Sequence, residues 1–299
     1  MRVVEVAQPP ATDAVEATVA LARDAESTTG VPALSDHLRL ELAAGGSDQP
    51  PLLVRVSEGG RSLAAAVIGA ANDTSVLEVV VSPDVDDPVE VRDDVAETAI
   101  DVHRQRGGGP VVWWLDDPGD HDHQVAARSG LVPTRELFEM RRPLPHPERA
   151  VVATRAFVPG QDDEAWLGVN NRAFASHGEQ GGWTADTLAL RMAEPWFDPA
   201  GFRVFEDDGR VVAFCWTKLH TDAEPVVGEI YVIAVDPDAH GRGLGKQLTL
   251  AGLDSISDRG VTVANLYVDA DNAAAVGLYR RLGFDVHRRR VAFGETADG

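Results

Sequence analysis

The sequence predicts an α/β protein built from two similar domains, and three observations support this prediction. The first is the run GEIYVIAV, residues 228–235, which is apolar and rich in β-branched side chains, as expected of a mostly buried strand. A glycine-rich loop follows it, and the next residues, LGKQLTLAGLDSIS, place Leu244, Leu248, Ala251 and Leu253 near helical spacing. The second observation is another strand-then-helix segment, and the third is an internal repeat.

The second segment is LYVDADNAAAVGLYRRLGF, residues 266–284. Its first four residues end a short strand. Asp271 or Asn272 can cap the helix that follows, and Gly283 can end that helix in the left-handed conformation. Because Asn272 and Tyr279 lie seven residues apart, two helical turns bring them to one face.

The repeat appears when the two halves of the chain are compared. VLEVVVSPDV at 76–85 resembles IYVIAVDPDA at 230–239, and the segments around Gly130 and Gly283 are also alike. The landmarks keep nearly equal spacing, with 47 positions from Pro83 to Gly130 and 46 from Pro237 to Gly283. The proline-containing stretch RPLPHPERA, residues 142–150, suits a linker. We therefore expect domains at residues 1–145 and 150–299.

The loop DPDAHGRGLGKQL, residues 236–248, is the strongest candidate for a binding site. The first turn of a helix has free backbone N–H groups and favours negative charge, and glycines let a bulky anion approach. The pattern is neither the dinucleotide fingerprint, because Lys246 stands where its last glycine belongs, nor a P-loop, because Gln247 follows Gly245-Lys246. A phosphate site is the functional interpretation, and a turn that only redirects the chain is the alternative.

Composition limits the partners and the location. The chain has 299 residues, 44% hydrophobic, and a formal net charge of −21, so its surface repels nucleic acid and anionic membranes. The N-terminal MRVVEVAQPP lacks a hydrophobic signal core, and no apolar run is long enough to span a bilayer. We expect a cytoplasmic monomer. Cys215, the single cysteine, lies in an expected strand and is interpreted as a buried thiol.

The two motifs resemble those of the Gcn5-related N-acetyltransferases (GNATs). Gly243 and Gly245 fit that family's pyrophosphate loop, with His240 where Gln or Arg is usual. The later segment matches the family's Asn-x-x-Ala-x-x-Leu-Tyr-x-x-x-Gly-Phe at Asn272, Ala275, Leu278, Tyr279, Gly283 and Phe284. The resemblance implies two tandem GNAT domains, each a mixed, mostly antiparallel sheet flanked by helices.

Nearly the whole chain resembles the mycothiol synthase family of tandem acetyltransferases, most particularly at residues 169–202, 214–220 and 228–253. The resemblance implies acetyl transfer from acetyl-CoA to the cysteinyl amine of a cysteine–glucosamine–inositol conjugate, the last step of mycothiol synthesis. It implies acetyl-CoA as co-substrate and no metal.

The resemblance also implies roles for individual residues. Glu229 corresponds to the general base, acting directly or through water on an acceptor amine that is mostly protonated at neutral pH, and Tyr279 to the acid that protonates the departing thiolate. For each there is a structural alternative, a solvated strand-end carboxylate and a packed core aromatic. The expected cofactor-binding residues are Ile233, Ala234, Val235, His240, Gly241, Arg242, Gly243, Leu244, Gly245, Lys246, Asn272 and Ala275.

A cationic, hydroxyl-rich acceptor needs acidic and stacking side chains. The resemblance points to Glu179, Lys218, Tyr267, Glu229 and, from the first half, Asp36. Trp183, close to Glu179, is expected to stack on a sugar. Lys218 and Asp36 can equally be surface charges, and Tyr267 an ordinary strand aromatic.

The first half is expected to have lost the cofactor chemistry. After Pro83 it has no glycine loop but carries Asp84, Asp86, Asp87 and Glu90, which would repel a pyrophosphate. Two other functions stay open. One is acetylation of a protein N-terminus, which an open groove would favour, or of another small amine. The other is non-catalytic sensing of acetyl-CoA, which the presence of both Glu229 and Tyr279 disfavours.

Overall fold

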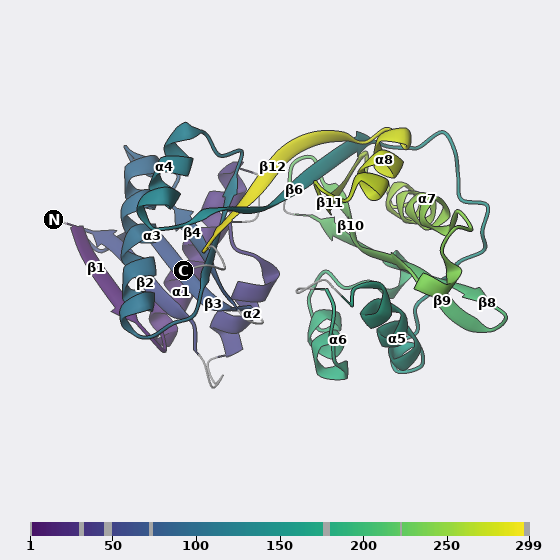
Figure 1. Ribbon diagram of the computed structural model, residues 1–299, viewed down its shortest axis with the longest axis horizontal. Helices are drawn as coiled ribbons and strands as arrows, with labels where there is room; N and C mark the ends of the chain where they lie inside the picture. The colour runs from purple at the N-terminus through teal and green to yellow at the C-terminus, as the bar shows by residue number, and fades with distance from the viewer. Residues whose placement is uncertain are drawn as a thin grey trace. The chain divides into compact units, whose positions relative to one another are not determined.

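The computed structural model of the chain describes residues 2–29, 33–44, 50–71, 74–175, 180–221 and 223–295. It divides into two compact units, one of Met1–Glu136 with Arg289–Gly299 and one of Leu137–Arg288. Figure 1 colours the chain from purple at the N-terminus to yellow at the C-terminus. Within the described residues, no helix is long and apolar enough to cross a membrane.

The first unit is a mixed sheet with helices on both faces. Its sheet has the order β1-β2-β3-β4-β5-β12. β4 pairs in parallel with β5, whereas the pairings β1–β2, β2–β3, β3–β4 and β5–β12 are antiparallel. Its elements are β1 (Arg2–Ala7), α1 (Thr12–Thr29), α2 (Asp36–Ala44), β2 (Leu52–Glu58), β3 (Arg61–Ala71), β4 (Thr74–Val81), α3 (Pro88–Gln105), β5 (Val111–Asp116), α4 (Asp120–Arg128) and the start of β6 (Val132–Pro143).

The second unit repeats this plan with the order β6-β11-β10-β9-β8-β7. Here β10 pairs in parallel with β11, whereas β6–β11, β9–β10, β8–β9 and β7–β8 are antiparallel. Its elements are β7 (Arg155–Ala156), α5 (Asp163–Ala173), α6 (Ala185–Met192), η1 (Pro199–Gly201), β8 (Phe202–Asp207), β9 (Arg210–His220), β10 (Val227–Val235), η2 (Pro237–Ala239), α7 (Leu244–Ser257), β11 (Val263–Asp269), α8 (Ala273–Arg281) and the start of β12 (Asp285–Gly294).

The predicted tandem GNAT fold is confirmed by this arrangement. The order β4-α3-β5-α4-β6 in the first half matches β10-α7-β11-α8-β12 in the second. Gly130 and Gly283, the landmarks of the repeat, both have φ near +75°, at 72° and 79°. That left-handed conformation costs glycine nothing and ends each helix at the same place in the plan.

Alternation along β9 explains how one strand serves two cores. Ala213 and Cys215 belong to the core beneath α7 and α8, and Phe214 and Trp216 to the aromatic core beneath α5 and α6. Successive strand side chains point to opposite faces, so this buried run fills both layers at once. Figure 1 shows α7 and α8 on one side of these strands and α5 and α6 on the other.

Each half of the chain also contributes a strand segment to the other unit. Residues 137–143 of β6 pair with β11 in the second unit, and residues 290–294 of β12 pair with β5 in the first. The units therefore divide near residues 136 and 288, and not at the proline-containing stretch 142–150 that composition suggested. Backbone pairing decides which sheet a segment joins, and the proline content of a stretch does not predict that pairing.

Candidate active site

The site begins where β10 and β11 stop pairing. Their parallel ladder runs from Val227 to Ile230 on β10, and β10 then continues to Val235 paired with β9. The register against β9 shifts between Ile230 and Val232, so Tyr231 is the extra residue of a bulge. Beyond Ile230, the described residues of β10 have no further register with β11. The predicted cofactor residues Ile233, Ala234 and Val235 lie on this stretch.

The loop after β10 ends at an open helix N-terminus. Gly243 is the N-cap of α7, has φ +74°, and gives the helix no side-chain cap. A Cβ at Gly241 or Gly243 would meet no atom within 4 Å, so the backbone is uncovered there. His240, Gly241, Arg242 and Gly243 are exposed, whereas Leu244 is buried and anchors the first turn. This geometry suits a bound anion.

Two cations flank the open terminus, and both are held by carboxylates at the surface. Arg242 Nη1 lies 2.7 Å from Asp207 Oδ2, and Lys246 Nζ lies 2.6 Å from Glu148 Oε1. The Arg242 guanidinium lowers the pKa of the Asp207 carboxyl. Exposed pairs of this kind contribute little free energy, so a phosphate can replace the carboxylates at small cost.

The equivalent helix of the first unit is closed to anions. α3 has the carboxylate of Asp87 as its cap, and Asp87 Oδ1 accepts from the backbone nitrogen of Glu90 at 3.0 Å. Pro88 removes a further donor from this first turn. The sequence argument against a phosphate here thus gains a structural basis, since an internal carboxylate already occupies the terminus.

Glu229 lies on β10 one residue before Ile230, at the end of the parallel ladder. It is opposite Lys218 on β9, and its Oε2 lies 2.6 Å from Nε2 of His220. The residue is 8% exposed, which a carboxylate tolerates when it is hydrogen-bonded. Glu229 is therefore not the solvated strand-end charge that the sequence left as an alternative.

Tyr279 projects from α8 into the core formed with α7. It is 8% exposed, and its ring meets Phe284 at 5.9 Å between centroids. Burial raises the pKa of Tyr279, with a smaller effect from Cys215, so the phenol stays protonated at neutral pH. Its position combines the two sequence interpretations, since the ring packs in a core while the hydroxyl keeps its proton.

The remaining predicted cofactor residues lie at the start of α8. Asn272 is its N-cap, and Asn272 Oδ1 accepts from the backbone nitrogen of Ala275 at 3.1 Å. Asn272 is exposed and Ala275 is half-buried. The structure thus gives the asparagine a capping role. Its contact with the cofactor stays a prediction.

The predicted acceptor-binding residues fall into two groups. Lys218 and Tyr267 are half-buried on β9 and β11, and Lys218 Nζ lies 4.7 Å from the ring centroid of Trp196 and 5.8 Å from that of Tyr231. Lys218 is thus an ammonium held over aromatic faces and not an ordinary surface charge. Glu179 and the side chain of Asp36 lie outside the described residues.

Trp183 is not the sugar platform that the sequence suggested. It is 8% exposed and meets Trp166 edge-on at 5.6 Å, inside the aromatic core of the second unit. Burying its large apolar ring beneath α5 and α6 is favourable, and the polar loop sequence around Trp183 gave no sign of this burial.

Two contacts around the candidate site were missed from the sequence. His220 stands two residues after Lys218, so strand alternation places both on one face of β9, and this spacing was the available signal. Asp236, 2% exposed, accepts from Arg172 of α5 and from the backbone nitrogen of Asp238, and so fixes the start of the glycine loop.

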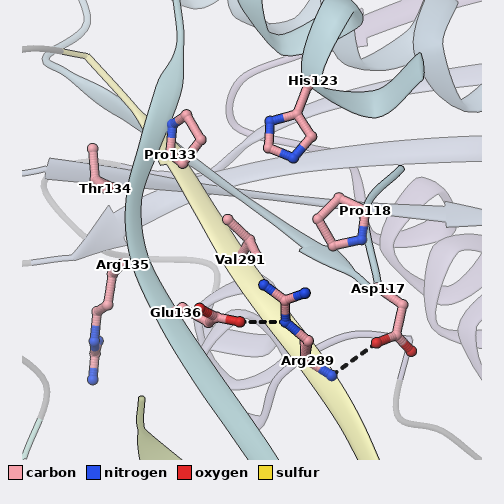
Figure 2. Close-up of a pocket in the computed structure, with 9 residues that line it drawn as sticks. All are labelled: Asp117, Pro118, His123, Pro133, Thr134, Arg135, Glu136, Arg289 and Val291. Carbon is pink, nitrogen blue, oxygen red and sulfur yellow. Dashed lines mark hydrogen bonds and ion pairs between the residues drawn. The ribbon is translucent and has the colours of Figure 1, made fainter. Parts of the chain in front are cut away.

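A pocket in the first unit, with a volume of about 450 Å³, contains none of the predicted site residues (Figure 2). Its lining includes Pro118, His123 and Val291, and Arg289 crosses it with its guanidinium paired to Glu136. Arg289 also donates from its backbone nitrogen to Asp117 Oδ1, so both carboxylates of the lining are already bonded to this arginine. The chemistry described above is on the second unit.

Comparison with known proteins agrees with the fold and the motifs. Residues 170–284 match the family model described as "Acetyltransferase (GNAT) family". A GCN5-related N-acetyltransferase from Sphaerobacter thermophilus has a TM-score of 0.70 at 21% identity, covering 98% of this chain and 95% of its own. A tandem GNAT protein from the clavulanic acid biosynthesis pathway has a TM-score of 0.66 at 16% identity, covering 98% of each chain.

The sequence relatives are more specific. The mycothiol acetyltransferase of Arthrobacter sp. (strain FB24) is 40% identical over 300 residues, which cover 94% of this chain and 92% of the relative. Similarity of this extent includes both units and the exchanged strands. The chain belongs to the mycothiol acetyltransferase family of tandem GNAT enzymes.

Proposed function

We propose that the second unit transfers an acetyl group from acetyl-CoA to the cysteinyl amine of a cysteine–glucosamine–inositol conjugate, completing mycothiol. Family membership establishes an N-acetyltransferase of mycothiol biosynthesis. The acceptor and the role of each residue are our inference. The observations that carry it are the buried, hydrogen-bonded carboxylate of Glu229 at the end of the β10–β11 ladder and the buried phenol of Tyr279 on α8, the helix that follows β11.

GNAT enzymes use acetyl-CoA, and the residues at α7 fit its pyrophosphate. The uncapped first turn offers backbone donors, the glycines leave room for a bulky anion, and Arg242 and Lys246 supply positive charge. Ile233, Ala234 and Val235 would pair with the pantetheine arm along β10. Bound there, acetyl-CoA supplies the activated acetyl group.

The side chains then divide the proton transfers between them. The acceptor reaches the enzyme as an ammonium, and Glu229 removes one of its protons so that the nitrogen lone pair can attack. Tyr279 gives its hydroxyl proton to the departing sulfur, and the proton lost from the attacking nitrogen replaces it. A backbone N–H of β10 beyond its ladder with β11 is suited to polarise the acyl oxygen.

The acceptor is held by charge and by aromatic surface together. Glu229 is a carboxylate at the reaction centre, and Lys218 lies opposite it on β9 above Trp196 and Tyr231. We propose that Lys218 and Tyr267 contact the hydroxyl groups of the conjugate, with Glu179 completing the set in this unit.

Product analysis tests this function. The purified protein is incubated with acetyl-CoA and the conjugate, and the product is sequenced by tandem mass spectrometry after alkylation of free thiols. We expect one acetyl group on the cysteinyl nitrogen and an alkylated cysteine sulfur. An acetyl group on sulfur, or no transfer to the conjugate, would contradict the proposal.

A further inference from the structure

We propose that His220 is a positioning residue for Glu229, and this inference rests on the proposed role of Glu229 as the base. His220 Nε2 lies 2.6 Å from Glu229 Oε2, a length typical of a charge-assisted hydrogen bond. Both side chains are largely shielded from solvent, with 22% and 10% exposure. The imidazole therefore donates from Nε2 and fixes one carboxylate oxygen, which leaves the other oxygen for the acceptor amine.

The pair is not needed to hold the two strands together. Backbone pairing joins β9 and β10 along their length, from the pair Val227–His220 to the pair Val235–Ala213. Its register shifts once, at the bulge. Removing one side-chain bond leaves this backbone pairing in place. What the bond does restrict is the rotation of Glu229, whose carboxylate must face the acceptor to act on it.

The surroundings of Glu229 make such a restraint useful. Lys218 is opposite it on β9, and Asn265 is opposite it on β11. Beyond Asn265 lie Glu139, 1% exposed, and Arg141, which are paired through Arg141 Nε at 2.6 Å. Glu229 thus stands in a row of polar groups that crosses four strands. In such a row a free carboxylate can rotate toward a cation other than the acceptor, and the imidazole holds it in one rotamer.

The kinetic test combines three single variants and one double variant. His220→Leu removes the donor, His220→Gln keeps an N–H donor near the same place, and Glu229→Gln removes the base. We expect His220→Leu to lower kcat by about 10- to 100-fold, the usual effect of losing an orienting partner, with the KM for acetyl-CoA unchanged. His220→Gln should recover most of that loss. His103→Leu, in the first unit and bonded to the carbonyl of Gly109, is the control and should behave like the native enzyme.

The double variant separates this inference from the proposed function. If His220 acts through Glu229, adding His220→Leu to Glu229→Gln causes no further loss, because the group that it orients is already gone. An additive loss, or a fully active His220→Leu beside a slow Glu229→Gln, would overturn the positioning role alone. A fully active Glu229→Gln would instead overturn the base itself, and the inference with it.

A spectroscopic measurement tests the bond without any turnover. In the full-length protein with ¹⁵N-labelled histidine, the His220 ring should show a protonated Nε2, and its signal should move in Glu229→Leu. An unprotonated Nε2 near neutral pH would mean that the imidazole accepts the bond, which contradicts the proposal.

Discussion

At the scale of single residues, the proposed chemistry depends on two side chains, Glu229 on β10 and Tyr279 on α8. Both were predicted from the sequence; Glu229 lies at the end of the β10–β11 ladder, and Tyr279 is buried in the core beneath α7 and α8. The contact of His220 with Glu229 was overlooked, because it depends on the pairing register of β9 with β10, which cannot be read from the sequence. Trp183 was misassigned, because its burial against Trp166 depends on tertiary packing.

Tyr279→Phe tests the proposed acid. The substitution keeps the ring and its contact with Phe284 but removes the proton, so kcat should fall by about 100- to 10,000-fold, the usual contribution of a general acid. The affinity for CoA and the melting temperature should change little. Because burial raises the pKa of Tyr279, deprotonation of this group should not lower kcat of the native enzyme between pH 8 and about 10. A kcat equal to that of the native enzyme would show that another group donates the proton.

Cys215 gives a separate prediction for stability at alkaline pH. Complete burial raises its pKa to about 12, above the value of an exposed thiol, so the folded state keeps a proton that the unfolded chain loses. Its contribution to stability is full below the unfolded pKa and is lost as pH rises through the folded pKa. Urea unfolding should therefore show the native protein losing stability between about pH 9 and 12, and Cys215→Ala losing less over the same range. Parallel losses in the two proteins would contradict this assignment.

At the scale of elements, the sequence predicted β10, the glycine loop and α7. It did not predict where the pairing of β10 with β11 ends. Apolar runs and glycines indicate where β10 ends and α7 begins. The bulge at Tyr231 and the end of the β10–β11 ladder at Ile230 depend on pairing with two neighbouring strands. These two features mark where the stretch of β10 begins that we assign to the pantetheine arm.

The loop before α7 can be tested with a matched pair of glycine substitutions. Gly243 and Gly260 have φ of +74° and +79°, and in both cases an added Cβ meets no atom within 4 Å. Alanine should therefore strain both positions alike, by about 1 to 2 kcal/mol. Calorimetry should find one tight CoA site in the native chain and in Gly260→Ala, and at least about tenfold weaker binding in Gly243→Ala. Equal affinities in the two variants, or two comparable sites in the native chain, would contradict a single cradle at α7.

At the scale of the whole molecule, the repeat was visible in the sequence, but the exchange of strand segments was not. Equal landmark spacing reports two copies of one fold. It does not report that residues 137–143 complete the second sheet and residues 290–294 the first. Sequence order and spatial order differ here because a strand joins whichever edge its backbone can pair with.

Fragments of the chain test the exchange. The fragment 150–299 lacks the strand that pairs with β11, so we expect it to aggregate or stay unfolded. The fragment 137–288 keeps that strand and should unfold cooperatively, as followed by circular dichroism. Cooperative folding of 150–299 with native-like stability would show that the exchanged segment is dispensable.

The central claim concerns the acceptor, and comparison of kcat/KM values tests it most directly. The conjugate, free cysteine and a cysteine-initiated peptide all offer the same amine, but only the conjugate offers the sugar and inositol hydroxyls. Contacts remote from the amine orient it for attack, so kcat/KM should be much the highest for the conjugate. A peptide that reacts as well as the conjugate, or better, would make the chain a protein acetyltransferase and would contradict the account.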